Sequence, residues 1–139
     1  MIQIERYCRL TTTLLKKTGA FDRQLENFIS EKDFSYFRDE VGLQFLEYLI
    51  AANPDSLTMS VAAFELSLLK LKLGEPVESF IDWKFEPYAV IDGLLKDTFD
   101  TASLVPGTYE VIVSSAHKQE MFWVINKEAN VAESTSNAE

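Results

Sequence analysis

The chain has 139 residues, 47% hydrophobic and 25% charged, which is enough to bury the core of one globular domain with a small appendage. Its 22 acidic and 13 basic residues give a formal net charge of −9, which disfavours binding to a phosphate backbone or an anionic membrane surface. The single cysteine, Cys8, excludes an internal disulfide and a cysteine-rich zinc site, and it fits a reducing compartment.

The first predicted element is a helix over residues 4–18. It is expected to stop at Gly19, because glycine readily adopts the left-handed conformation that ends many helices. Charges interrupt the apolar residues of this segment, and no apolar run in the chain reaches membrane-spanning length, so we expect no signal peptide and a cytoplasmic location. The segment is locally basic, which indicates either a solvated helix face or a surface that orients the chain on an oppositely charged partner. Its basic residues are Arg6, Arg9, Lys16 and Lys17.

Two more helices are predicted before the middle of the chain. The second covers residues 21–30. Ser30 or Asp33 is expected to cap the third helix, which must end before Pro54 because the residue preceding a proline avoids helical geometry.

The clearest helical pattern covers residues 57–73. Asp55 and Ser56 precede it and can accept hydrogen bonds from the free amides of its first turn, and Gly74 closes it. Apolar residues occupy most of its circumference, so we expect it at the centre of the helical layer.

Beyond Pro76 the apolar spacing changes from helical to alternating, which predicts a strand over residues 80–85. A helix over residues 88–97 follows, and Pro106 with Gly107 predicts a turn. The helix is expected to bury Val90, Ile91, Leu94 and Leu95. The strand is expected to place Ile81, Trp83 and Phe85 on one face and Phe80, Asp82 and Lys84 on the other.

Two further strands are predicted at residues 109–114 and 121–126, and the connection between them allows a loose hairpin. The last strand is apolar on both faces, so a single helix cannot cover it alone. Either the N-terminal helices or another molecule must cover the second face. Residues 128–139 have one large apolar residue and predict a disordered tail.

Together these elements predict an α+β fold. Residues 1–75 form a bundle of about four helices, residues 76–127 form a β-α-β-β module with a three-stranded sheet, and residues 128–139 form the tail. A three-stranded sheet has two edges, and an uncovered edge can accept an extended peptide as a further strand. We expect that edge at residues 109–114 or at residues 121–126.

No catalytic residue and no metal site is predicted. His117 is the only histidine and is distant in sequence from Cys8, which argues against a histidine-based triad and against His/Cys metal ligation. The glycines are scattered and form no phosphate-binding loop, so we expect no cofactor. A catalytic carboxylate pair would have to come from Asp82, Glu86 and Asp92, for which capping or solvation is the simpler interpretation.

Large aromatic and aliphatic residues gather in the predicted sheet. Such residues can stack on single-stranded nucleic acid when basic residues frame them, but here the frame is acidic. The competing interpretation is a sheet core together with a partner-facing patch. The residues that we predict to contact the partner are Trp83, Tyr109, Val111, Val113, Phe122, Trp123 and Val124.

Five segments carry a family resemblance: LEYL at residues 46–49, VAAFEL at 61–66, FIDW at 80–83, PYAVI at 87–91 and PGTYEVIVS at 106–114. This pattern resembles the small partner proteins of multinuclear non-haem iron peptide-modifying enzymes, as in methanobactin biosynthesis. The resemblance spans roughly residues 40–126 and contains no catalytic motif. It implies a subunit that docks on the iron enzyme and presents a ribosomally made precursor peptide, whose leader pairs with the C-terminal sheet. The metal and the oxidation chemistry would belong to the partner.

We therefore expect a non-catalytic accessory subunit that binds a protein or peptide and no membrane. The first alternative is a regulatory or nucleic-acid-associated protein, which only the basic opening segment and the threonines at residues 11–13 favour. The second alternative is a small enzyme that uses carboxylates.

Overall fold

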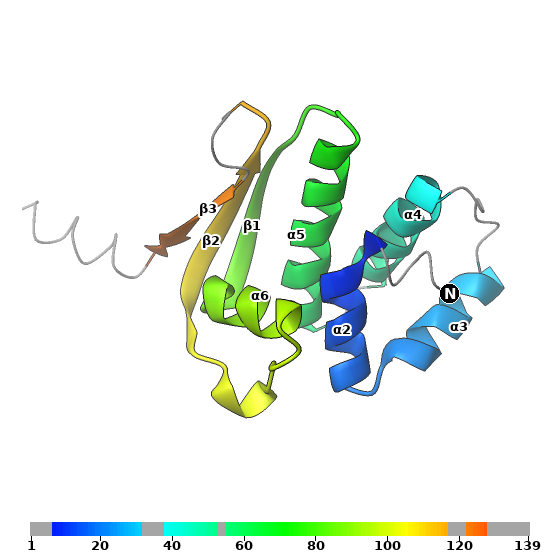
Figure 1. The fold of residues 1–139 in the computed structure, drawn as a ribbon, viewed down its shortest axis with the longest axis horizontal. Helices are drawn as coiled ribbons and strands as arrows, with labels where there is room; N and C mark the ends of the chain where they lie inside the picture. The colour runs from blue at the N-terminus through cyan, green and yellow to red at the C-terminus, as the bar shows by residue number, and fades with distance from the viewer. Residues whose placement is uncertain (1–6, 32–37, 53–54, 117–121, 128–139) are drawn as a thin grey trace, which may run out of the picture.

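The computed structural model describes residues 7–31, 38–52, 55–116 and 122–127. Helices come first and a three-stranded antiparallel sheet follows, which confirms the predicted α+β fold (Figure 1). Met121, His117 and the predicted tail lie outside the described residues. The elements are α2 (Arg9–Lys17), α3 (Phe21–Glu31), α4 (Arg38–Ala51), α5 (Ser56–Lys72), β1 (Glu78–Phe85), α6 (Pro87–Leu95), the 3-10 helix η1 (Thr101–Ser103), β2 (Pro106–Ser114) and β3 (Phe122–Asn126).

Helix α3 lies where the sequence predicts it, whereas α2 begins only at Arg9, because the backbone at Cys8 (φ −121°, ψ 45°) is not helical, so the predicted helix over residues 4–18 is not continuous. Gly19 follows α2 with a positive φ of 77°, as expected for a glycine that ends a helix. Ser30 lies inside α3, so it does not cap α4, and the alternative cap Asp33 is outside the described residues.

Helix α5 stands between two hydrophobic clusters. On one side, Phe64 belongs to a core that α5 shares with the sheet, α6 and α2. On the other side, Ala62 and Leu69 belong to a core that α5 shares with α3 and α4. The apolar circumference of this helix is therefore buried against both neighbours. As predicted, Asp55 caps it by accepting a hydrogen bond from Thr58 N at 3.1 Å.

A carboxylate from α5 also caps the N-terminus of α2. Glu65 accepts hydrogen bonds from the backbone N–H groups of Leu10 and Thr11, each at 2.8 Å. Cys8, the residue at the cap position of α2, makes no side-chain cap, so Glu65 takes over this function from another helix. Burial raises the pKa of the Glu65 carboxyl, and the hydrogen bonds from Thr11 and Leu10 lower it by less.

The sheet has the order β1-β2-β3, and both pairings are antiparallel. Strand β2 is therefore central, so the prediction of an open edge at residues 109–114 is wrong, whereas β3 is an edge strand in the part of the chain that the structure describes. The predicted turn at Pro106 and Gly107 is also wrong, because these residues begin β2. Proline is tolerated at the first residue of a strand, and the chain reverses earlier, around η1.

Helix α6 carries Pro87 at its first position, and the Glu86 side chain caps it by accepting a hydrogen bond from Ala89 N. Val90, Ile91 and Leu94 are buried as predicted, but Leu95 is 46% exposed. The helical rotation of about 100° per residue carries Leu95 away from the buried side. No helix among the described residues is long and apolar enough to cross a membrane.

Candidate functional site

The strand register divides the side chains of the sheet between two faces. We call the face that packs on α5, α6 and α2 the helical face, and the opposite one the outer face (Figure 1). The helical face carries Ile81, Trp83, Tyr109, Val111, Val113, Phe122 and Val124, all of which belong to the sheet core or pack against it. The outer face carries Phe80, Asp82, Glu110, Ile112, Trp123 and Ile125.

Six of the seven predicted partner-contacting residues lie on the helical face. Trp83, Val111 and Val113 are at most 1% exposed, so their side chains hold the sheet on the helices. Phe64 of α5 meets two rings from this face edge to face, Trp83 with ring centroids 6.1 Å apart and Phe122 at 4.8 Å. Tyr109, Phe122 and Val124 are only partly buried, and Trp123 alone of the seven lies on the outer face.

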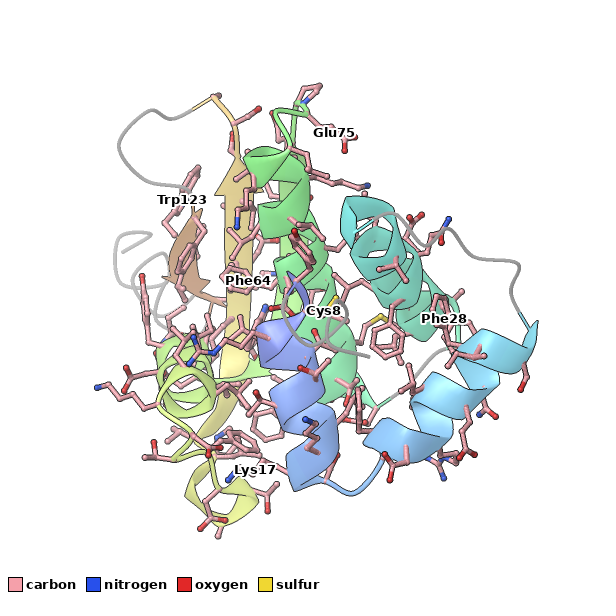
Figure 2. All side chains as sticks on the ribbon, turned by 45° about the vertical axis from the view of Figure 1, so that its right-hand side comes forward. Cys8, Lys17, Phe28, Phe64, Glu75 and Trp123 are labelled. Atoms are coloured by element: carbon pink, nitrogen blue, oxygen red, sulfur yellow. The ribbon has the colours of Figure 1, made fainter. Side chains whose placement is uncertain are left out.

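An apolar row crosses the outer face. Phe80 pairs with Ile112, and Ile112 pairs with Trp123, so the three residues lie side by side on the three strands. Phe80 is 59% exposed, and Trp123 lies at the left of Figure 2, on the edge strand. The predicted partner set does not include Phe80, although the alternation of the first strand, which separates this residue from Trp83, already indicated its outward direction.

Helix α5 closes the β1 edge of the sheet. The Ser60 hydroxyl donates to the Asp82 backbone carbonyl at 2.7 Å, so this carbonyl points out of the sheet and is already bonded. The Ser67 hydroxyl also meets the hydroxyl of Ser79 at 3.0 Å. An incoming peptide would have to displace α5 to pair with β1.

The β3 edge presents a defined set of backbone groups. Ser115 N donates to Val77 O at 2.8 Å, which makes the odd-numbered residues of β1 those that bond to β2. Antiparallel alternation then directs Trp123 and Ile125 to their partners on β2. The N–H and C=O groups of Phe122 and Val124 point the other way, to the side where no strand pairs with β3 among the described residues.

Charged groups lie beside the apolar row of the outer face. Lys127 Nζ lies 3.2 Å from an Asp82 carboxylate oxygen and 3.7 Å from one of Glu110. The hydrogen bond and the negative charge of Asp82 raise the pKa of Lys127, and Glu110 adds to the effect, so this lysine is positively charged at neutral pH. The row beside the apolar one consists of Asp82, Glu110 and Ile125, so it carries two carboxylates, and Lys127 is their counterion.

The candidate catalytic carboxylates each have a separate local contact. Asp82 binds Lys127, Glu86 caps α6, and Asp92 pairs with Lys96 at 3.2 Å. The described residues include no group of three or more His, Cys, Asp or Glu side chains that could hold a metal ion. A groove of about 530 Å³ between the end of α5 and the end of β2 is lined by one acidic residue, Glu75. The three candidate carboxylates therefore do not converge on one site; Glu110 lies beside Asp82, and Lys127 is the counterion of this pair.

The basic residues of the opening segment are also engaged within the chain. Arg9 donates to the Leu95 carbonyl at 3.0 Å, and Lys17 pairs with Asp97 at 3.1 Å. Lys16 lies over the Phe21 ring, 5.2 Å from its centroid. These three described side chains therefore form no convergent cationic surface for a phosphate backbone, and Arg6 lies outside the described residues.

No protein-family model, curated protein or solved structure matches the chain. The chemistry of the site is therefore judged from its geometry. The β3 edge with the outer face supplies main-chain hydrogen-bonding groups and partly exposed apolar side chains. Such a surface can hold an extended chain by strand pairing and apolar contact.

Proposed function

We propose that this protein is a non-catalytic accessory subunit that binds an extended peptide segment of its partner as a fourth strand beside β3. The observation that carries the proposal is the asymmetry of the sheet edges. The β1 edge is bonded to Ser60 of α5, whereas the register directs backbone groups of Phe122 and Val124 away from the sheet.

The side chains beside β3 provide contacts on both faces of the added strand. On the outer face, alternate peptide residues would pack against Trp123 and Ile125. On the helical face they would lie beside Phe122, whose ring is 6.2 Å from that of Tyr88, a residue that is 54% exposed. Each main-chain hydrogen bond contributes about 0.5 to 1.5 kcal/mol net, so we expect micromolar affinity after the cost of ordering the peptide.

The partner that we propose is the one implied by the resemblance of residues 40–126, an iron-dependent peptide-modifying enzyme and its precursor peptide. A presenting subunit suits micromolar binding, because the modified peptide must be released. Co-expression with such an enzyme and affinity purification tests this version. Recovery of the enzyme with the subunit is the expected result, and failure of both enzyme and precursor to bind at micromolar concentration contradicts it.

Strand addition itself is tested by titrating the ¹⁵N-labelled protein with an extended peptide and following its amide resonances. The Phe122 and Val124 amides should shift most. Val124→Pro should abolish binding because proline has no N–H, while the matched control Val124→Ala, which keeps the N–H, should still bind. Equal binding by both variants, or shifts confined to α3 and α4, would exclude β3 as the docking strand.

A further inference from the structure

We infer that the peptide that pairs with β3 is basic, with an apolar residue beside Trp123 and a lysine or arginine two positions along the peptide, beside Ile125. This inference rests on the proposed function and adds the chemical class of its ligand. Three observations carry it: the charge of the sheet region, the order of the rows on the outer face, and the reach of Lys127.

The sheet region is strongly acidic. From Glu78 onward the described residues include seven acidic ones and three basic ones. Two of these bases, Lys96 and Lys127, are already bound to Asp92 and Asp82. The surface around β3 therefore attracts a cationic peptide and repels an anionic one, both during approach and in the complex.

The rows of the outer face continue onto an added strand. The first row, Phe80, Ile112 and Trp123, is apolar, so the peptide residue at its end would be apolar as well. The next row contains Asp82, Glu110 and Ile125. A peptide residue at the end of this row faces two carboxylates across the sheet, and a cation is the side chain that they stabilise.

Lys127 shows that a side chain can span the required distance. It follows β3 directly, yet its Nζ atom reaches Asp82 on β1, two strands away. A residue on the added strand would stand two strands from Glu110 on β2, roughly the same 10 Å. A lysine or arginine of the peptide can therefore reach Glu110 while Lys127 remains on Asp82.

The test uses three fluorescently labelled extended peptides that are identical except for Lys, Gln or Glu at the position two residues from an aromatic residue. Fluorescence anisotropy at low salt should show the Lys peptide binding about fivefold tighter than the Gln peptide, and the Glu peptide binding more weakly than both. The advantage of Lys should shrink as salt is raised.

Two variants distinguish a local contact of the peptide with Glu110 from an effect of the net charge of the protein. Glu110→Gln should remove most of the preference for Lys, while Glu47→Gln, an equal charge change at an exposed position on α4, should retain it. Equal binding of the Lys and Gln peptides to the wild type, or equal loss of the preference in both variants, would overturn the inference and leave the proposed function standing. If none of the three peptides binds, the proposed function falls as well.

Discussion

The carboxylate of Glu65 on α5 accepts a hydrogen bond at 2.8 Å from the backbone N–H of Thr11 on α2, across 54 residues of sequence. A second bond from Leu10 N has the same length. Both amides belong to the first turn of α2, where no carbonyl within the helix can accept them. One side chain of the central helix therefore fixes the position of α2.

Glu65→Ala should destabilise the protein by about 2 to 4 kcal/mol, because it leaves two backbone N–H groups without acceptors at buried residues. Chemical denaturation gives the free energy of unfolding. The matched control is Glu47→Ala on α4, at an exposed position, which should stay within about 0.5 kcal/mol of the wild type. Similar losses in both variants would show that the cap is energetically minor.

The raised pKa of Glu65 predicts a pH dependence of stability. Since the folded state holds the proton more tightly than the unfolded state, this group stabilises most below its unfolded pKa of about 4.5. That contribution is lost as pH rises through the folded pKa. The neighbouring Cys8 thiol stays neutral, because burial raises its pKa and the charge of Glu65 raises it further.

Measured from about pH 5 to about pH 8, the unfolding free energy of the wild type minus that of Glu65→Gln should therefore fall. Glutamine does not titrate, so the subtraction removes the contribution of other groups. A difference that grows with pH would mean that the folded protein favours the charged form of Glu65.

Phe64→Ala should cost about 3 to 5 kcal/mol, because the ring packs against both Trp83 and Phe122 and leaves a cavity when removed. Hydrogen exchange should also accelerate in β3, which loses its contact with α5. Phe80→Ala is the matched control on the outer face. Since Phe80 is 59% exposed, its loss should cost about 0.5 kcal/mol or less.

Two adjacent proline substitutions test the bonding pattern of β3. Ile125→Pro should lower stability by about 1 to 3 kcal/mol, because it removes an N–H that the register directs to Glu110. Val124→Pro removes an N–H on the open side and should cost less, as proline is tolerated on edge strands. Thermal melting compares the two. A greater loss from Val124→Pro would reverse the assigned pattern.

Local patterns predicted most of the helices and strands. The alternation that separates Phe80 from Trp83, the cap at Asp55 and the stop at Gly74 all act within one element, and the structure confirms them. The turn expected at Pro106 was wrong because the register between β1 and β2, with its irregularity near Phe85, is a long-range property. The cap that Glu65 supplies to α2 is also a long-range contact, so local patterns did not predict it.

The candidate site was less predictable for the same reason. Apolar strand residues such as Val111 look alike in the sequence whether they face a core or a partner, and only the packing of α5 assigns them to the core. Which strand lies at the edge depends on strand order, which periodicity does not encode. For this surface, alternation correctly predicted only that Phe80 points to the opposite face from Trp83.

The bond from Ser60 to Asp82 also limits assembly. With α5 bonded to β1, β3 is the edge that the described residues leave for a further strand. A second copy that pairs there through its own β3 occupies both edges, so this association stops at two copies and does not continue into a fibre.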